Sequence, residues 1–317
     1  MKNFPIPLSV KPEKRTEYLK NIALITKNTG RLFLIAGDQK MEHLNDDFFG
    51  PKIAPEDNNP EHFFKITAAS NGGVLATHLG LISKYGRNYP KLPYIVKING
   101  KTNLGLNDEK DSSAPLWTVT DIVNFKKQSG LKIGAIGYTL YLGGKYEAKM
   151  LAEAAKAIFE AHQAGLAAIL WVYPRGKGVK EEDIHTIAGG AGVAACLDAD
   201  FVKIKYPYNT KNKKQTALDF QEAIVAAGKT RVICVGGSKQ PAKEILSSLK
   251  LQLETSGSYG LAIGRNLHQR SLEEATRLAQ ALSAMILNSS SLKDALDIYN
   301  KKSKSTPKNN SKFLGLF

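Results

Sequence analysis

The amino-acid sequence predicts a (β/α)8 barrel, an α/β fold in which eight parallel strands close into a cylinder surrounded by helices. Eight short runs rich in Val, Ile, Leu and Ala recur along the 317 residues, as expected of strands buried on both faces. Longer segments with apolar residues at helical spacing separate these runs. The alternative is a doubly wound open sheet, whose dinucleotide-binding members carry G-x-G-x-x-G after the first strand. Here the first run ends Ala36-Gly37-Asp38-Gln39, without that loop.

The predicted elements alternate from residue 32 onward. The strands, in chain order, are 32–38, 73–78, 94–99, 132–138, 167–174, 201–206, 231–237 and 260–265. The helices between and after them are 61–70, 79–85, 118–129, 147–164, 180–196, 215–227, 240–254 and 268–287. We expect three regions: an N-terminal extension of residues 1–31 with one helix that closes the barrel bottom, the barrel itself at 32–290, and a basic C-terminal segment at 291–317 that is flexible at its end.

Composition limits the class of protein. Charged residues make up 23% of the chain and hydrophobic residues 43%, which is typical of a globular protein. No stretch reaches the roughly 20 apolar residues that span a bilayer, and the first residues lack a secretory apolar region, so we expect a cytoplasmic protein with no membrane partner. Cys196 and Cys234 both lie in apolar segments and are expected to be buried free thiols.

The charge is strongly basic. Lys and Arg number 44 against 29 Asp and Glu, a net charge of +15, and five of the lysines lie in residues 301–317. A basic protein attracts anions, including nucleic acids and phosphorylated metabolites. The sequence has no helix-turn-helix, zinc-finger or RNP motif, so nucleic acid is not the expected partner.

The strand 201–206 carries two lysines on one face. Lys203 and Lys205 alternate with Val202 and Ile204, so both lysines should point into the barrel with Phe201. Burial and a second nearby cation both lower the pKa of a lysine. A neutral amine in a polar cavity suits Schiff-base chemistry on a carbonyl substrate. A structural ion pair at the barrel mouth explains the same pattern equally well.

Polar side chains also follow other strands, where a barrel of this kind carries its active site. Trp171, Tyr173 and Arg175 share one parity and would supply an aromatic wall, a phenol that relays protons and a cation for phosphate. An ordinary surface turn is the alternative for these three residues. Asp38 follows the first strand and could bind substrate hydroxyls, assist proton transfer or pair with a lysine. Lys97 is expected to be an ion-pair partner of an inward acid.

The last two strands end in glycines. Gly236-Gly237-Ser238 and Gly264-Arg265-Asn266 occupy the positions where barrels frequently bind phosphate through backbone N–H groups. Arg265 would add charge to this site. The six histidines form no clustered ligand pattern, so no metal site and no cofactor are expected.

These motifs together resemble the archaeal-type class I fructose-bisphosphate aldolases, a group that also contains related phospho-sugar thiolases and synthases. The resemblance covers about residues 32–270. It rests on Gly37-Asp38 with Glu42-His43, Lys97-Ile98-Asn99-Gly100-Lys101-Thr102, Trp171-Val172-Tyr173-Pro174-Arg175-Gly176, Ala199-Asp200-Phe201-Val202-Lys203, Gly236-Gly237 and Gly264-Arg265-Asn266.

The resemblance implies a role for each candidate residue. Lys203 would form the Schiff base, Tyr173 would act as acid and base, and Asp38 would handle substrate hydroxyls. The substrate-binding set would be Trp171 lining the pocket, Arg175 at the second phosphate, Lys205 beside the nucleophile, and Gly236, Gly237, Gly264 and Arg265 at the ketone-side phosphate. Lys205 is expected to help keep Lys203 neutral, and it is the fallback nucleophile.

The implied reaction is metal-independent, reversible cleavage of fructose 1,6-bisphosphate to dihydroxyacetone phosphate and glyceraldehyde 3-phosphate. The implied assembly is a homo-oligomer, in the form of a decamer. Two departures leave alternatives open: Gln39 stands where the family usually has His, and Val235 where it often has Ser. The alternatives are a related Schiff-base thiolase or transaldolase-like enzyme, and an inactive basic scaffold that binds nucleic acid.

Overall fold

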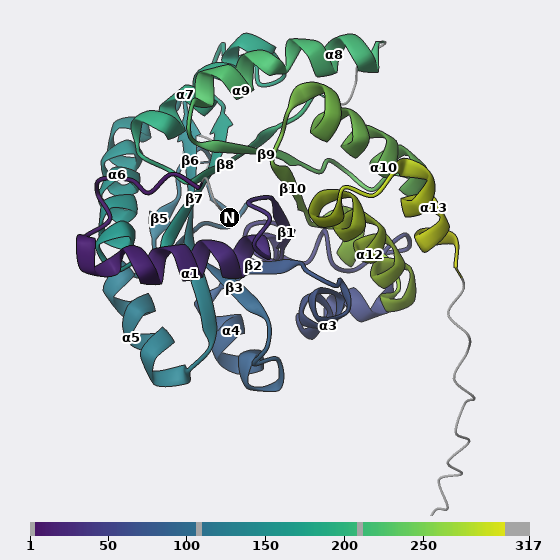
Figure 1. The fold of residues 1–317 in the computed structure, drawn as a ribbon, viewed down its shortest axis with the longest axis horizontal. Helices are drawn as coiled ribbons and strands as arrows, with labels where there is room; N and C mark the ends of the chain where they lie inside the picture. Colours follow the sequence, from purple (N-terminus) through teal and green to yellow (C-terminus); the bar gives the residue numbers. More distant parts are fainter. Residues whose placement is uncertain (1–3, 106–109, 208–211, 302–317) are drawn as a thin grey trace, which may run out of the picture.

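Eight strands of the protein form one closed parallel barrel surrounded by helices (Figure 1). The computed structural model describes residues 4–105, 110–207 and 212–301. The strands follow one another around the barrel in the order β1-β10-β9-β8-β7-β6-β3-β2, and β2 pairs with β1 to close it. The predicted fold class is therefore confirmed.

All eight predicted strands are present, with small changes at their ends. The barrel strands are β1 (Leu32–Ala36), β2 (Val74–His78), β3 (Pro93–Lys97), β6 (Lys132–Leu142), β7 (Ala167–Pro174), β8 (Phe201–Lys205), β9 (Arg231–Val235) and β10 (Gly260–Ile263). A short antiparallel pair, β4 (Asn99–Gly100) with β5 (Ala114–Pro115), lies in the connection after β3 and was not predicted.

The helices also follow the predicted order. They are α1 (Arg15–Thr26), α2 (Gln39–Glu42), α3 (Glu61–Ala69), α4 (Leu79–Tyr85), α5 (Val119–Ser129), α6 (Glu147–Gln163), α7 (Ile184–Cys196), α8 (Lys213–Asp219), α9 (Gln221–Ala227), α10 (Ala242–Leu251), α11 (Arg265–His268), α12 (Leu272–Asn288) and α13 (Leu292–Asn300). The bounds of several predicted helices differ from those observed. Helix α7 begins four residues later than expected, and 215–227 is divided into α8 and α9. Helix α10 ends at Leu251 before a π-helical turn (Gln252–Ser256), and α12 begins at Leu272, after the separate short helix α11.

Alternation along the strands separates two cores. Val202 and Ile204 of β8 belong to the core between barrel and helices, whereas Phe201 belongs to the core inside the barrel. The inner core also contains Ile169 and Trp171 of β7. Side chains of alternate residues therefore point inward on these strands, as the sequence predicted.

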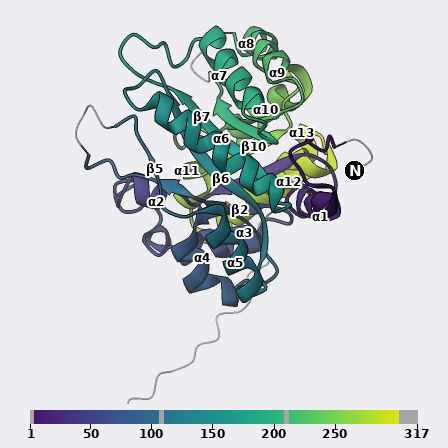
Figure 2. The same cartoon turned by 90° about the vertical axis from the view of Figure 1, so that its left-hand side faces the viewer.

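The N-terminal residues pack against one end of the barrel. Phe4 and Val10, together with Tyr18, Ile22 and Ile25 of α1, join the inner core. Figure 2 shows α1 at one end of the barrel, with α2 and β5 at the opposite end. The helix expected within residues 1–31 is thus α1, and it covers the end away from the carboxyl ends of the strands.

Two features of the C-terminal half differ from expectation. Cys196 is exposed rather than buried, because it is the last residue of α7 and lies beyond that helix's apolar face; Cys234 of β9 is buried as predicted. The segment expected to be a basic tail begins with a helix, α13, which packs on α12. Residues 302–317 lie outside the described residues. Across the described ranges, no helix is both long and apolar enough to cross a membrane.

Candidate active site

A cavity of about 340 Å³ opens at the carboxyl ends of the barrel strands. All ten residues proposed from the sequence line this one cavity. They are Asp38, Trp171, Tyr173, Arg175, Lys203, Lys205, Gly236, Gly237, Gly264 and Arg265. Barrel closure therefore brings together residues that are spread over most of the chain.

Lys203 lies deep in the cavity on β8. Its neighbours in the sheet are Trp171 of β7 and Ile233 of β9, and it is only 4% exposed. Its Nζ atom is 5.2 Å from the centre of the Trp171 ring. Burial lowers the pKa of Lys203 to about 8, and the nearby charges of Lys97 and Arg265 act in the same direction against Asp38 and Glu42. A lysine in this state holds a usable fraction of neutral amine near neutral pH.

Asp38 and Lys97 form a buried pair beside Lys203. The Nζ atom of Lys97 is 3.8 Å from Oδ2 of Asp38, and it also lies 5.5 Å from the Trp171 ring centre. Burial alone would raise the pKa of Asp38, but Lys203 and Lys97 outweigh it and hold that pKa below its usual range. Asp38 is therefore a carboxylate at neutral pH, and the prediction that Lys97 pairs with an inward acid is confirmed.

Lys205 lines the same cavity, on the same face of β8 as Lys203, but it is engaged in ion pairs of its own. It pairs with Glu182 at 3.0 Å and Glu181 at 3.8 Å, and its side chain is 36% exposed. The expected effect of Lys205 on Lys203 is supplied by other cations: the charges of Lys97 and Arg265 lower the pKa of Lys203.

Tyr173 stands on the wall of the cavity. Burial raises the pKa of its phenol well above the usual value, and the carboxylates of Asp38 and Glu42 add to this effect. The guanidinium carbon of Arg175 lies 5.1 Å from the Tyr173 ring centre and 5.0 Å from that of Tyr141. Tyr173 is therefore a neutral phenol, able to donate a proton, with a cation beside it.

Three buried polar atoms of the site have no hydrogen-bond partner within the described part of the chain. They are the indole Nε1 of Trp171, the carboxylate Oδ1 of Asp38 and the amide Oε1 of Gln39. Buried polar groups are normally satisfied, so an unsatisfied donor and acceptor in one cavity point to a polar ligand. A hydroxyl group, which both donates and accepts, can satisfy a donor and an acceptor together.

The glycine end of the cavity differs in one detail from the predicted phosphate site. The Gly236 N–H donates to the carbonyl of Ala262 at 2.8 Å, so it is used in the barrel and is not available to a phosphate. The amide of Gly237 makes no such contact with any described residue. A Cβ at Gly264 would overlap the side-chain oxygen of Gln39, so this residue, which departs from the family pattern, lies directly beside the expected phosphate site.

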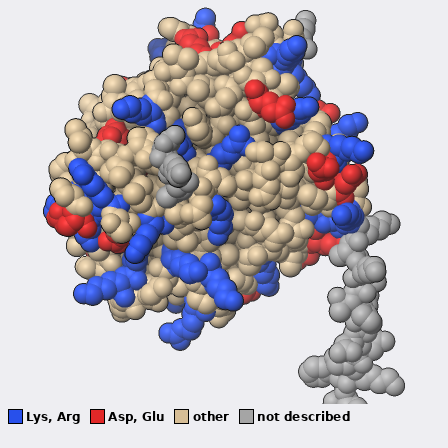
Figure 3. All heavy atoms as spheres, viewed as in Figure 1, with Lys and Arg blue, Asp and Glu red and all other residues tan. Residues whose placement is uncertain are grey.

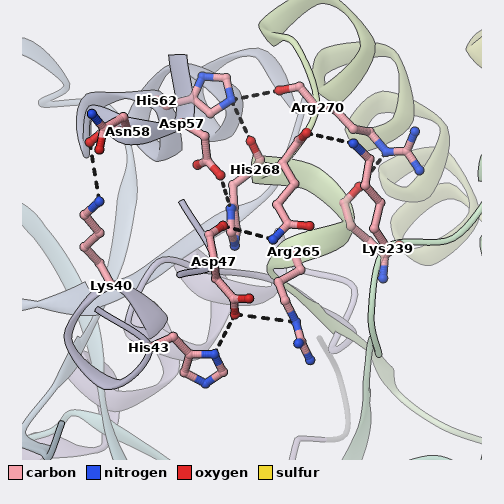
Figure 4. A network of polar contacts seen from close by, with 12 residues as sticks. Lys40, His43, Asp47, Asp57, Asn58, His62, Lys239, Arg265, His268 and Arg270 are labelled. Carbon is pink, nitrogen blue, oxygen red and sulfur yellow. Dashed lines mark hydrogen bonds and ion pairs between the residues drawn. The ribbon is translucent and has the colours of Figure 1, made fainter. Parts of the chain in front are cut away.

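The roles of the acidic side chains that follow β1 were not predicted from the sequence. Glu42 lines the cavity and accepts a hydrogen bond from Tyr141 at 2.8 Å. Asp47 contacts both His43 and Arg265 (Figure 4). Glu42-His43 was named only as part of the family motif, without a role, and Asp47 was not named, because so short a helix and the loop after it have no periodicity that shows which side chains face a site. Over the described ranges, no group of three or more His, Cys, Asp or Glu side chains could hold a metal ion.

Comparison with known families gives a match over residues 32–270 to the model of the DeoC/LacD family of aldolases. A protein of Methanocaldococcus jannaschii, named fructose-bisphosphate aldolase/6-deoxy-5-ketofructose 1-phosphate synthase, is 50% identical over 295 residues, which cover 93% of this chain and 94% of the relative. The class 1 fructose-bisphosphate aldolase of Halobacterium salinarum is 31% identical and covers 84% of this chain and 94% of its own.

Solved structures agree with these relatives. The fructose-bisphosphate aldolase of Slackia heliotrinireducens superposes with a TM-score of 0.90 at 43% identity, covering 96% of each chain. An archaeal fructose-1,6-bisphosphate aldolase superposes with a TM-score of 0.73 at 29% identity, covering 85% of this chain and 99% of the other. In that structure the catalytic lysine is covalently bound to the carbinolamine intermediate of the substrate.

Proposed function

Because the chain belongs to the DeoC/LacD family of aldolases, we propose that it is a class I fructose-bisphosphate aldolase in which Lys203 forms the Schiff base. The observation that carries this assignment is the state of Lys203, a buried lysine with a pKa lowered to about 8 beside the Lys97–Asp38 pair. A structural ion pair would instead hold the lysine charged. Among the described residues, Lys203 has no carboxylate within ion-pair distance.

The first half of the reaction is formation of the imine. Neutral Nζ of Lys203 attacks the C2 ketone of fructose 1,6-bisphosphate and forms a carbinolamine. The Tyr173 phenol donates a proton to the departing hydroxyl, which leaves as water, and a positively charged iminium remains. Lys97 counters part of the Asp38 charge, so the carboxylate can face the substrate without raising the pKa of Lys203 to its ordinary value.

The second half is cleavage. The Tyr173 phenolate left by the first half takes the proton of the C4 hydroxyl, the C3–C4 electron pair moves into the iminium, and glyceraldehyde 3-phosphate departs. The Asp38 carboxylate is assigned to accept hydrogen bonds from substrate hydroxyls. Tyr173 shuttles the proton that later returns to C3 of the enamine. Hydrolysis then releases dihydroxyacetone phosphate. The Gly237 amide, Gly264 and Arg265 are assigned to the ketone-side phosphate, and Arg175 to the other.

Borohydride trapping tests this assignment. Incubation with dihydroxyacetone phosphate, reduction, digestion and mass spectrometry should give an adduct on Lys203, and Lys203→Ala should lose both adduct and turnover while retaining its circular dichroism spectrum. Lys65→Ala, at an exposed lysine of α3, is the matched control and should behave as the unaltered protein. An adduct on Lys205, or turnover retained in Lys203→Ala, would contradict the assignment.

A related reaction of the same enamine is the second candidate. The Methanocaldococcus jannaschii relative is also named a 6-deoxy-5-ketofructose 1-phosphate synthase. Breaking the C3–C4 bond of that product gives dihydroxyacetone phosphate and 2-oxopropanal, so the enamine on Lys203 would add to a different aldehyde. The sequence alternative of a transaldolase-like enzyme corresponds to this reaction, and the step at Lys203 is common to both.

The remaining expectations are part of the proposal. A homo-oligomer in the form of a decamer and a place in glycolysis and gluconeogenesis rest on the family resemblance, and a cytoplasmic location rests on the composition of the chain. The proposed partner is a phosphorylated sugar, and neither nucleic acid nor a cofactor has a role in the proposed reaction.

A further inference from the structure

The long connection after β1 meets the segment after β10 behind the proposed phosphate site (Figure 4). The first segment carries His43, Asp47 and Asp57, and the second carries Arg265 and His268. His43 and Arg265 line the cavity, whereas Asp47 does not. The function of Asp47 must therefore be sought in the side chains that it contacts.

Asp47 contacts two of the side chains that line this end of the cavity. Its Oδ2 atom is 2.5 Å from Nδ1 of His43 and 3.8 Å from Nε of Arg265. Burial raises the pKa of Asp47, but its contacts with His43 and Arg265 more than offset this, so it remains a carboxylate. One carboxylate therefore holds two side chains that face the substrate.

The contact with Arg265 leaves the two terminal nitrogens of the guanidinium free to bind a ligand. Asp47 takes the Nε side, and no carboxylate of the described residues pairs with the two terminal nitrogens. Those terminal N–H groups are the ones that bind phosphate oxygens in a bidentate manner. An arginine held at Nε loses less conformational freedom when phosphate binds than an unrestrained one does.

Asp47 is itself held firmly. Its backbone carbonyl accepts a hydrogen bond from Gln269 at 2.9 Å. The next residue, Phe48, is fully buried and stacks on His268 with ring centres 4.7 Å apart. His268 in turn contacts the buried carboxylate of Asp57 at 2.7 Å. The backbone at Asp47 is thus tied to the segment that carries Arg265, so the carboxylate has a defined position relative to the guanidinium.

We propose that Asp47 is a positioning residue that holds Arg265 and His43 ready for the ketone-side phosphate of the substrate. This inference rests on the proposed function of the cavity. It assigns to Asp47 an effect on phosphate recognition and none on the attack by Lys203.

The test compares two ketones that differ only in the phosphate. Borohydride trapping on Lys203 is measured at increasing concentrations of dihydroxyacetone phosphate and of unphosphorylated dihydroxyacetone. For Asp47→Asn, the half-saturating concentration of dihydroxyacetone phosphate should rise about tenfold, the effect of losing a charge-assisted contact of ~1.4 kcal/mol. The half-saturating concentration of dihydroxyacetone and the maximal adduct should stay within about twofold, because neither involves the phosphate.

Asp46→Asn is the matched control, since Asp46 is the exposed neighbour of the same charge. It should change neither half-saturating concentration. Asp47→Glu, which keeps the carboxylate, should recover most of the affinity for dihydroxyacetone phosphate and tests the idea even if Asp47→Asn is unstable.

Three results would overturn the inference, and they are distinguishable. Equal loss of affinity for both ketones would mean that Asp47 has only a structural role. Unchanged affinity for dihydroxyacetone phosphate in Asp47→Asn would mean that Arg265 needs no positioning. No adduct in the unaltered protein would instead overturn the proposed function, and this inference with it.

Discussion

At the scale of single residues, the site depends on three charged groups that are costly to bury. Lys203 and Asp38 line the cavity and Lys97 is buried beside Asp38, and removing an ion from water costs several kcal/mol unless another charge compensates. Two lysines share one carboxylate here, so one amine remains without an ion-pair partner in the described structure. Lys203 is that amine, and its lowered pKa follows from burial together with the second cation.

The first prediction concerns the pH dependence of imine formation. Since the neutral amine is the nucleophile, the rate of imine formation by the unaltered protein should rise with pH through about 8, the pKa of Lys203. Lys97→Met removes a positive neighbour and frees the Asp38 carboxylate, and both changes favour protonated Lys203. The midpoint should therefore move up by about one pH unit.

The measurement is the initial rate of borohydride-trapped adduct between pH 6 and 10. Lys65→Met, outside the site, should leave the midpoint where it is. A midpoint that responds to Lys205→Met and not to Lys97→Met would restore the interpretation made from the sequence.

At the scale of elements, two glycines differ in whether their surroundings leave room for a side chain. A Cβ at Gly137 of β6 would overlap the six-membered ring of Trp171, so this strand needs a residue without a side chain to seat the indole in the cavity wall. Gly189 of α7 is exposed, and a Cβ there would meet no atom within 4 Å. The second glycine only weakens its helix.

Alanine substitutions should separate these two cases. Gly137→Ala overpacks the barrel interior and should destabilise the protein by about 1–3 kcal/mol, with a lower rate of imine formation because Trp171 moves. Gly189→Ala should stabilise it by roughly 0.5–1 kcal/mol and leave imine formation unchanged. Thermal unfolding together with trapping rates measures both, and a gain in stability for Gly137→Ala would refute the packing argument.

At the scale of the whole molecule, the N-terminal residues are joined to the barrel by a buried polar network. The hydroxyl of Tyr18 on α1 donates to Asp200, and Ser9 contacts His162 at 2.7 Å. His162 is fully buried on α6 and contacts Asp200 at 3.1 Å. Basic side chains are spread over the face that carries α1 (Figure 3). The buried network lies beneath them and adds to the apolar contacts by which the N-terminal segment joins the inner core.

This network predicts how stability depends on pH. Burial lowers the pKa of His162, but hydrogen bonds to Asp198 and Asp200 outweigh it and raise the pKa to about 9 from an ordinary value of 6.5. A raised pKa contributes stability that is complete below pH 6.5 and is lost as the pH rises through 9. The contribution is on the order of 3 kcal/mol.

His162→Gln should therefore be less stable than the unaltered protein by the largest margin near pH 6, with the difference shrinking toward pH 9. Urea unfolding at several pH values measures it. His185→Gln is the control, because His185 contacts Glu222 on the surface and is 90% exposed. A pH-independent difference for His162→Gln would show that the imidazole is not charged in the folded protein.

The sequence by itself determined the barrel and the side of each strand that faces inward. Both follow from local geometry: side chains alternate along a strand, so the parity of Phe201 and Lys203 or of Trp171 and Tyr173 is readable from spacing alone. The family motifs then added chemical roles to the inward residues. The same reasoning did not reveal that Lys205, at the end of β8, pairs with Glu181 and Glu182.

Only the tertiary structure decided which groups act on one another. Lys97 acts on Lys203, the Gly236 amide donates to Ala262, and Asp47 contacts Arg265. The last contact arises because β1 and β10, distant in sequence, become neighbours when the barrel closes, and the second because β9 pairs with β10. Closure depends on the packing of the whole chain, and local spacing contains no information about which loops it brings together.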